Sequence, residues 1–395
     1  MINEKMLALG ETRSSIRAVA EYGTARKAQI GADNVFDFSL GNPSVPSPKA
    51  VNDTIISLCN NMDSLSLHGY TPANGKPETR AAVAKIESRR AGYEIPPECV
   101  YMTCGAAASL TSTIKALANP GDKIAVFAPF FPEYKVFVEN ADAELVIIPP
   151  DGKMLPDLNK LAKAVKDGLK AVIMNSPNNP TGVIYGEDTI SAVADILKAA
   201  SKEKGEPIYL ISDEPYRELV YGDGQVPFVP NFYDDTIICY SYSKSLSLPG
   251  ERIGYVLVPP CVTDSEKVNS AVRGAGRSLG FVCAPSLFQS ILPMCADERP
   301  DIDAYDRNRR LMYNALTEMG FECIYPDGAF YLFMKAPGGD AEQFCEAAKK
   351  YELLLVASDS FGVPGYVRIS YCVSEKTILD SLPSFKKLAE ECFGK

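Results

Sequence analysis

From about residue 98 to residue 258 the chain alternates short apolar runs with helix-length amphipathic segments, and this alternation is the feature that most constrains the fold. Strands that alternate with helices form a mostly parallel sheet covered by helices on both faces. We therefore predict an α/β domain built on seven strands, separated for the most part by helices such as those at 109–117, 157–168 and 187–205. The predicted strands are VYMT (100–103), KIAVFA (123–128), ELVIIP (144–149), AVIMN (171–175), IYLIS (208–212), TIICYS (236–241) and RIGYVLV (252–258).

The last part of the chain has a different pattern, which indicates a second, smaller α+β domain. A chain of 395 residues exceeds the ~250–300 at which one core usually stops growing, so two domains are expected. We predict a large domain over 46–284, and a small domain made of 1–45 and 285–395 and joined by a long interdomain helix. The elements expected there are a helical stretch from Pro285 to Met319, segments at 329–336, 340–352, 353–358 and 366–371, and a closing helix from Ser374.

Composition excludes several classes of protein. The formal charge of −10 argues against nucleic acid as a partner. The single histidine, His68, excludes a multi-histidine metal site and makes a histidine-activated serine improbable, so no metal is expected. Eleven cysteines without CxxC spacing indicate free thiols in a reducing compartment. We find no apolar run long enough to span a membrane and no secretory signal, so a cytoplasmic location is expected.

Polar residues follow three of the predicted strands at the point where each ends. AVIMN runs into SPNNPTG, IYLIS into DEPY, and TIICYS into YSK. In an open parallel sheet, ligands bind beyond the carboxyl ends of the strands. We therefore expect Lys244 to lie in one crevice with Asn179, Asp213 and Tyr216.

Each of these signals also has a purely structural interpretation. SPNNPTG has the composition of a turn, and Asp213 is a common kind of helix cap. GAAASL (105–110) is either a tight helix start or an anion site at a helix N-terminus. A lone lysine such as Lys244 is usually a surface residue, and Arg368, inside a predicted strand, fits an ordinary ion pair. It is the order and combination of the signals that favour a functional site.

Taken together, the motifs resemble the class I/II aminotransferases, the aspartate aminotransferase-like group of fold type I pyridoxal 5′-phosphate enzymes. The resemblance covers nearly the whole chain and implies that group's fold, with a large cofactor-binding domain and a smaller one. The segments that carry it, in chain order, are SLGNPSVPSP, GYTPANGKPETRAAVA, APFFPEY, SPNNPTG, SDEPY, SYSKSLSLPGERIGY, PDGAFYLF and YVRISY.

The resemblance implies three catalytic residues. Lys244 would form a Schiff base with the cofactor aldehyde and then move a proton between the substrate Cα and the cofactor C4′. Nearby positive charge and partial desolvation would lower the pKa of this lysine. Asp213 would keep the pyridine nitrogen protonated. Tyr216, together with Asn179, would hydrogen-bond the ring hydroxyl.

The same resemblance assigns the remaining contacts to cofactor and substrate. Arg368 would clamp the substrate α-carboxylate with two parallel hydrogen bonds, helped by Asn179 and by the close approach that Gly41 permits. Tyr70 would reach the neighbouring subunit's phosphate, which implies a homodimer with shared active sites. Phe131 would stack on the ring, and the phosphate would be bound by Arg252, the hydroxyls of Ser241 and Ser243, and the backbone N–H groups of Gly105, Ala106 and Ala107.

The phosphate loop CGAAAS lacks the long polar side chains common in relatives, so its contribution is expected to come from the backbone. Ala107 also stands where some aspartate-using relatives carry a lysine for the distal carboxylate. The motifs therefore do not identify the residue that binds the distal carboxylate of a substrate. The sequence offers four candidates for this role: Arg13, Arg17, Arg273 and Arg277.

The leading functional prediction is an aminotransferase that moves an amino group from an acidic amino acid such as aspartate to 2-oxoglutarate. A carbon–sulfur β-lyase with the same site is a second hypothesis, and the motifs do not distinguish a β-lyase from an aminotransferase. A regulator that senses the cofactor is an alternative from another class. Such regulators attach a DNA-binding segment, which we do not find here, and the acidic charge disfavours this alternative.

Overall fold

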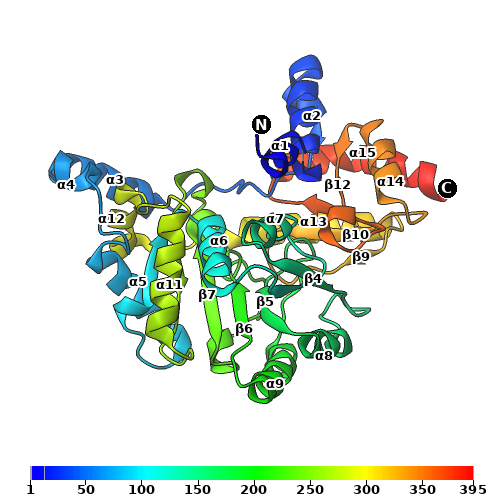
Figure 1. The fold of residues 1–395 in the computed structure, drawn as a ribbon. Helices are drawn as coiled ribbons and strands as arrows, with labels where there is room; N and C mark the ends of the chain where they lie inside the picture. The colour runs from blue at the N-terminus through cyan, green and yellow to red at the C-terminus, as the bar shows by residue number, and fades with distance from the viewer. Residues whose placement is uncertain (1, 13, 395) are drawn as a thin grey trace.

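A seven-stranded sheet forms the centre of the computed structural model, which describes residues 2–12 and 14–394 (Figure 1). Strand β8 is antiparallel to both of its neighbours, while β4, β3, β5, β6 and β7 are parallel. This confirms the predicted mostly parallel sheet. In spatial order the strands are β2 (Val100–Thr103), β8 (Gly254–Leu257), β7 (Thr236–Ser241), β6 (Tyr209–Asp213), β5 (Leu169–Asn175), β3 (Lys123–Phe127) and β4 (Glu144–Ile148).

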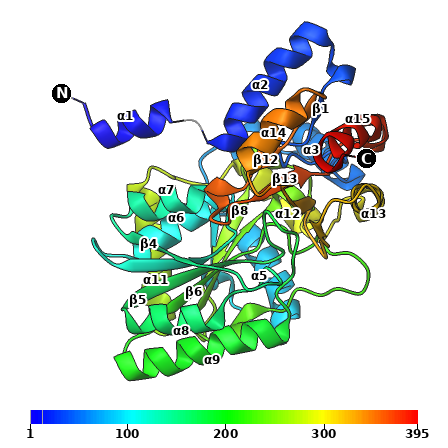
Figure 2. The ribbon, with the colours of Figure 1, turned by 90° about the vertical axis from the view of Figure 1, so that its right-hand side faces the viewer.

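Helices cover both faces of this sheet (Figure 2). Alternate residues of a strand point to opposite faces, so Ile173 of β5 packs in the core under α6, whereas Val172 packs in the core under α9. Buried strands of this kind are apolar on both sides, which is why they were recognisable in the sequence. One face carries α6 (Ala106–Leu117), α7 (Glu133–Asn140) and α11 (Ser265–Ser278), and the other carries α8 (Leu158–Lys166) and α9 (Glu187–Lys204).

A further apolar core lies at the β2 end of the sheet, where four helices gather. Helix α12 (Ser286–Cys295) contacts α3 (Lys49–Asn61), α4 (Ser64–His68) and α5 (Pro77–Ala91). Its Ile291 and Leu292 are fully buried beside Val83 of α5 and Tyr255 of β8. The residues of α12 therefore share a core with the large sheet.

A four-stranded antiparallel sheet forms the second part of the molecule. Its order is β12 (Val356–Ala357), β13 (Tyr366–Ser370), β10 (Tyr331–Lys335) and β9 (Cys323–Ile324). Beside it β1 (Phe36–Asp37) pairs in parallel with β11 (Leu353–Leu354), which ties the N-terminal region to this part. The surrounding helices are α1 (Glu4–Glu11), α2 (Ser15–Ile30), α13 (Ile302–Glu318), α14 (Ala341–Lys349) and α15 (Glu375–Phe393).

The long helix expected from Pro285 to Met319 is wrong in one respect, because the structure divides it into α12 and α13. Pro300 disfavours helical geometry in the residue before it, and Asp301 starts a new helix by accepting a hydrogen bond from the Ala304 N–H at 2.9 Å. The division into domains at 45/46 and 284/285 stays a proposal. No helix in the described ranges is long and apolar enough to cross a membrane.

Candidate active site

The carboxyl ends of β5, β6 and β7 meet at one cavity of about 290 Å³. Asn175 and Asp213 are the last residues of β5 and β6, and Ser241 is the last residue of β7. The cavity is closed from the other side by Arg368 of β13 and Tyr331 of β10, so it lies between the two sheets. The structure thus brings together the groups that the strand ends were predicted to gather.

Lys244 lies in α10 (Tyr242–Ser245), a single turn that starts directly after β7. Ser241 caps this turn, since its Oγ accepts a hydrogen bond from the Ser243 N–H at 3.1 Å. The Lys244 ammonium donates to the Gly41 carbonyl at 2.7 Å. Burial lowers the pKa of Lys244 to about 8, and the positive charge of Arg252 acts in the same direction. The unprotonated, nucleophilic form of this amine is therefore far more populated near neutral pH than it is for an ordinary lysine.

Asp213 is a buried carboxylate in which one oxygen accepts a hydrogen bond and the other accepts none from the described residues. Tyr134 donates its hydroxyl proton to Oδ2, whereas Oδ1 is buried without a hydrogen-bond partner among the described residues. Burial raises the pKa of Asp213 to about 7, while the hydrogen bond from Tyr134 lowers it. A buried acceptor with no partner is costly, so Oδ1 fits a ligand that brings a donor or a positive charge.

The N-terminus of α6 lines the cavity through Ala106 and Ala107, in a setting that suits an anion. The first N–H groups of a helix have no partners within the helix and carry a partial positive charge. Arg252 lies beside them, with its Nη1 donating to the Pro249 carbonyl at 2.9 Å and to Ser243 Oγ at 3.4 Å. Gly105 is required here for two reasons. Its φ is 85°, and a Cβ would come within 2.6 Å of Arg252 Nη2.

Arg368 lies at the opposite end of the cavity and is 2% exposed. Its Nη1 donates to Asn179 Oδ1 at 3.1 Å, and its Nη2 donates to the Ser39 carbonyl. Burial lowers the pKa of this guanidinium. Among the described residues Arg368 forms no ion pair, so a buried positive charge faces the cavity without a carboxylate. Such a site suits an anionic ligand.

The loop that carries Asn179 is positioned by Asn175. The side-chain carbonyl of Asn175 accepts the Asn179 N–H at 2.8 Å, and its amide donates to the Asp213 carbonyl at 2.9 Å. Asn178 fixes the turn in the same way, since its Oδ1 accepts from the Thr181 hydroxyl at 2.8 Å. The polar residues of SPNNPTG are therefore used both to form a turn and to place one side chain in the cavity.

Most residues predicted from the sequence line this cavity, and two do not. Gly105 lies behind Arg252, as described above, and Tyr70 is 93% exposed on the surface. The residues brought together are Gly41, Ala106, Ala107, Phe131, Asn179, Asp213, Tyr216, Ser241, Ser243, Lys244, Arg252 and Arg368.

Three of the four candidates for a distal carboxylate, Arg17, Arg273 and Arg277, do not line the cavity of their own chain. Arg17 is exposed near the start of α2, one residue after Ile16, which does line the cavity. Arg273 and Arg277 are exposed on α11 and line a separate cavity of about 610 Å³. Arg13 lies outside the described residues.

Sequence reasoning missed three polar residues of the cavity: Tyr134, Asn175 and Tyr331. Tyr134 ends the motif APFFPEY, and Asn175 ends a predicted strand, so both stood beside recognised signals. Tyr331 opens the strand YLFMK and lies inside the recognised segment PDGAFYLF, but nothing in that segment indicated that its side chain reaches the cavity. The apolar wall formed by Ile16, Leu110 and Phe137 had no recognisable signal.

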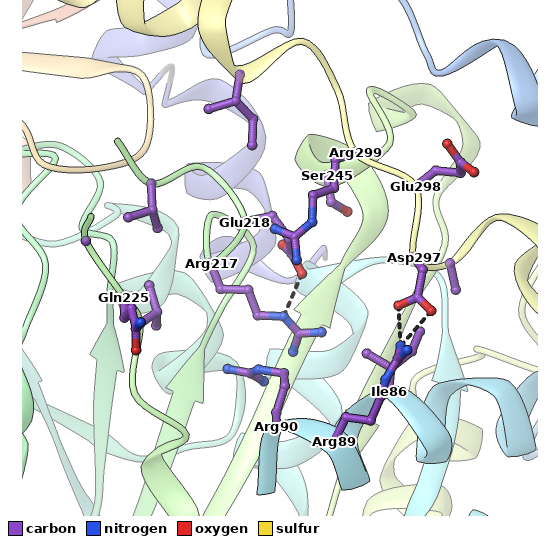
Figure 3. Close-up of a pocket in the computed structure, with 15 residues that line it drawn as sticks. Ile86, Arg89, Arg90, Arg217, Glu218, Gln225, Ser245, Asp297, Glu298 and Arg299 are labelled. Atoms are coloured by element: carbon purple, nitrogen blue, oxygen red, sulfur yellow. Dashed lines mark hydrogen bonds and ion pairs between the residues drawn. The ribbon is translucent and has the colours of Figure 1, made fainter. Parts of the chain in front are cut away.

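A more spacious cavity of about 730 Å³ has Ser245 of α10 in its lining (Figure 3). Arg217 and Glu218 form an ion pair in its wall at 2.8 Å, and Arg89 pairs with Asp297 there. This cavity does not contain Lys244 or Asp213, and its charges are mostly paired with one another, so we assign the chemistry to the smaller cavity. Within the described ranges, no group of His, Cys, Asp and Glu side chains is arranged to hold a metal ion.

Comparison with known proteins agrees with this geometry. The model of the family "Aminotransferase class I and II" matches residues 33–382. The aspartate aminotransferase of Streptomyces avermitilis is 28% identical, over 96% of this chain and 97% of its own length. The crystal structure of an aminotransferase from Eubacterium rectale has a TM-score of 0.97 and 51% identity, covering 100% of this chain and 99% of that one. Aspartate aminotransferase from Thermotoga maritima has a TM-score of 0.84 at 26% identity, over 95% and 97% of the two chains. With a family match that spans nearly the whole chain, this protein belongs to the class I and II aminotransferases.

Proposed function

We propose that this transaminase holds pyridoxal 5′-phosphate in the 290 Å³ cavity and moves an amino group from aspartate, or another acidic amino acid, to 2-oxoglutarate. Enzymes of this family depend on that cofactor. When bound, it supplies an aldehyde carbon that reacts with an amine and a ring that withdraws electrons. The observation that carries the proposal is that one cavity is lined by Lys244, Asp213, Arg252 and Arg368.

The residues of the cavity fit this cofactor at both of its ends. The N-terminus of α6 with Arg252, Ser241 and Ser243 suits a phosphate, because backbone N–H groups, hydroxyls and a guanidinium all donate to its oxygens. At the other end, the unpartnered Oδ1 of Asp213 suits a protonated ring nitrogen. Phe131 lines the cavity between these ends and offers a ring face for stacking.

Lys244 is proposed to link the cofactor and to carry the proton. Because its pKa is lowered to about 8, its amine takes up and releases a proton close to neutral pH. It would move this proton between the substrate Cα and the cofactor C4′. Asp213 would hold the proton of the ring nitrogen, and Asn179 and Tyr216 would donate to the ring oxygen. Burial of these groups excludes water and strengthens each of the contacts.

Arg368 is proposed to bind the α-carboxylate of the amino acid. Its guanidinium is buried without an ionic partner among the described residues, and Asn179 holds it in place. A planar guanidinium matches the two oxygens of a carboxylate. Gly41 lies at the same end of the cavity, where a larger residue would collide with the Tyr331 hydroxyl.

We propose that two copies of the chain form a homodimer with shared active sites. Tyr70 does not contribute to the cavity of its own chain, and large apolar side chains are also exposed on α3, on α4 and before α12: Ile56, Leu65 and Val282. Helices α3 and α4 both contact α12 and lie at one end of the molecule (Figure 1). Exposed apolar surface of this kind favours association. Arg273 and Arg277 line a cavity with Val282, so the partner's copies of these arginines are candidates to read a distal carboxylate. A cytoplasmic location stays a prediction from composition.

The proposal is tested by assaying aspartate, glutamate, alanine and phenylalanine as donors with 2-oxoglutarate or oxaloacetate as acceptor. We expect aspartate with 2-oxoglutarate to give oxaloacetate and glutamate with the highest kcat/KM. Borohydride treatment should attach the cofactor to a peptide containing Lys244, and the variant Lys244→Ala should be inactive. The control Lys267→Ala, at a side chain that is 80% exposed, should be fully active. Labelling of a different lysine would contradict the site. Release of pyruvate and ammonia from cystathionine-like substrates without an acceptor would favour the β-lyase.

A further inference from the structure

Two buried tyrosines meet where the two sheets face each other at the cavity. Tyr216 lies just after β6, and Tyr331 begins β10. Their hydroxyl oxygens are 2.9 Å apart, and their rings pack edge to face with centroids 5.6 Å apart. Both residues line the cavity, and both are nearly fully buried. This pair connects the groups proposed to bind the cofactor with the groups proposed to bind the substrate.

One of the two hydroxyl protons in this pair has no acceptor within the pair. Two tyrosine hydroxyls carry two protons, and a single hydrogen bond between them uses one. Neither hydroxyl has another hydrogen-bond partner within the described part of the chain. Buried donors are rarely left unsatisfied, so the second proton is available to a ligand in the cavity.

The surroundings of Tyr331 determine which of the two hydroxyls donates within the pair. The guanidinium carbon of Arg368 lies 4.7 Å from the centre of the Tyr331 ring. Burial raises the pKa of both phenols, to about 12 for Tyr331, while the Arg368 charge lowers both. Because the Arg368 guanidinium lies over the ring of Tyr331, its positive charge polarises that hydroxyl and makes Tyr331 the better donor. Its hydroxyl is also held in position, because it packs so close to Gly41 that a Cβ there would lie only 2.0 Å away.

We propose that Tyr331 is a positioning residue that donates a hydrogen bond to the Tyr216 hydroxyl and thereby strengthens the hydrogen bond from Tyr216 to the ring oxygen of bound pyridoxal 5′-phosphate. This inference rests on the proposed function. Hydrogen bonds in a chain polarise one another, so a hydroxyl that accepts a hydrogen bond becomes a stronger donor. Gly41 serves the same arrangement in two ways, since its missing side chain leaves room for Tyr331 and its carbonyl accepts from Lys244.

The consequence concerns the proton on the nitrogen of Lys244 that links the cofactor. A stronger donor to the ring oxygen stabilises negative charge on that oxygen, so the neighbouring linking nitrogen loses its proton at a lower pH. Other ionisable groups also act on this end of the cavity: Asp213, Arg252, Arg368 and Cys372. They are unchanged in a Tyr331→Phe variant, so a comparison with the wild-type protein isolates the hydroxyl.

The experiment is a spectroscopic pH titration of the cofactor-loaded protein without substrate. The visible band of the bound cofactor changes when the linking nitrogen gains or loses its proton, and the midpoint pH is measured. We expect Tyr331→Phe to raise this midpoint by about half a pH unit and Tyr216→Phe to raise it further. In a Tyr216→Phe background, Tyr331→Phe should have no additional effect, because Tyr331 acts only through Tyr216.

The matched control is Tyr371→Phe. Tyr371 belongs to a second buried tyrosine pair in the same apolar core, where its hydroxyl lies 3.4 Å from that of Tyr221, and it does not line the cavity. Its removal should leave the midpoint unchanged. Where Tyr331→Phe does not yield folded protein, site-specific 3-fluorotyrosine at position 331, a more acidic phenol of nearly the same shape, should lower the midpoint.

Three results would overturn the inference. They are an unchanged midpoint in Tyr331→Phe, an equal shift in Tyr371→Phe, or additive shifts in the double variant. An unchanged midpoint with weaker binding of a substrate-like carboxylate would show that Tyr331 donates to substrate instead. These outcomes leave the proposed function intact. Wild-type protein without a titrating visible band would instead contradict the proposed function itself.

Discussion

Arg368 shows at the scale of a single residue how burial makes a charge useful. Its guanidinium is almost inaccessible, and its hydrogen bonds go to neutral oxygens of Ser39 and Asn179. Burying an unpaired charge is unfavourable, and a carboxylate ligand relieves that cost. The guanidinium is therefore preorganised to bind an anion.

We therefore expect Arg368→Lys to bind the cofactor normally but to use amino acids poorly. A lysine keeps the positive charge and loses the two parallel hydrogen bonds of the guanidinium. The loss in kcat/KM should correspond to about 2–4 kcal/mol of transition-state stabilisation. Steady-state kinetics with several amino acids provide the measurement. Wild-type kcat/KM for all of them, with unaltered cofactor binding, would remove Arg368 from the substrate site.

A second prediction at this scale concerns the bond between Tyr134 and Asp213. Burial raises the pKa of Asp213 to about 7 in the folded protein, whereas an unfolded aspartate titrates near ~4. The folded state therefore binds this proton more tightly, and the stability contributed by the protonated carboxyl is present below about pH 4 and is lost as the pH rises to about 7.

Tyr134→Phe removes a hydrogen bond that lowers the pKa of Asp213, so the loss of stability should continue to higher pH. At pH 8 the cofactor-free variant should be less stable than the wild type by about 2 kcal/mol, and the difference should vanish in acid. Urea unfolding of the cofactor-free protein from pH 4 to 8 tests this. The control is Asp213→Asn, in which Tyr134→Phe should no longer change the pH dependence. A deficit that is equal at every pH would show that only packing is affected.

At the scale of elements, a buried ionic cluster fixes helix α5 to the chain segment after β6. Glu87 of α5 is fully buried and accepts hydrogen bonds from Arg217 at 2.8 Å, Arg90 at 3.0 Å and Tyr255 at 2.7 Å. Arg217 also stacks on Tyr240, with its guanidinium carbon 3.8 Å from the ring centre (Figure 3 shows Arg217 and Arg90). The hydroxyl of Tyr240 in turn donates to Ser245, next to Lys244. The cluster thereby supports the turn that carries the lysine.

We expect Glu87→Gln to cost about 2–3 kcal/mol of unfolding free energy, because it weakens buried hydrogen bonds to charged groups, while Arg90 keeps Glu214 and Arg217 keeps Glu214 and Glu218 as charge partners. The matched control is Arg89→Gln on the same helix, whose partner is Asp297 and whose side chain is 56% exposed. An exposed pair of this kind contributes at most about 1 kcal/mol. Chemical denaturation of both variants gives the comparison, and equal costs would contradict the role assigned to the buried cluster.

For the whole molecule, the exposed position of Tyr70 bears on whether two subunits share their active sites. If Tyr70 serves the neighbouring subunit, mixing Tyr70→Phe with Lys244→Ala subunits should create a wild-type site in each heterodimer. Random exchange would give such a site in about one quarter of positions. Activity at limiting cofactor is the readout, together with a sedimentation experiment that establishes the dimer.

A mixture of Asp213→Ala and Lys244→Ala serves as the control, because both residues line the same cavity of one chain. It should recover no activity. A fully active monomer at the assay concentration, or equal recovery in both mixtures, would refute the shared site.

Local sequence patterns predicted the large sheet and most of the residues that line the cavity. Most strands of the sheet are buried on both faces and are continuous apolar runs, and all seven were located to within two residues at each end. Polar residues at the strand ends were correctly expected to meet, because parallel strands bring their carboxyl ends to one edge. The order of motifs gave the family. All of these signals are formed by residues close together in the chain, so they can be recognised in the sequence without the structure.

Tertiary structure alone decided the contacts between segments far apart in the chain. The partner of Asp213 is Tyr134, the partner of Tyr216 is Tyr331, and Arg368 faces Asn179 across 189 positions. No local pattern encodes which side chains meet, since that depends on how two sheets pack across a cavity. The break between α12 and α13 was also missed, although Pro300 and Asp301 marked it, because the apolar and charged residues on both sides continue a helical pattern. Local chemistry thus specified the elements, and packing specified which side chains act together.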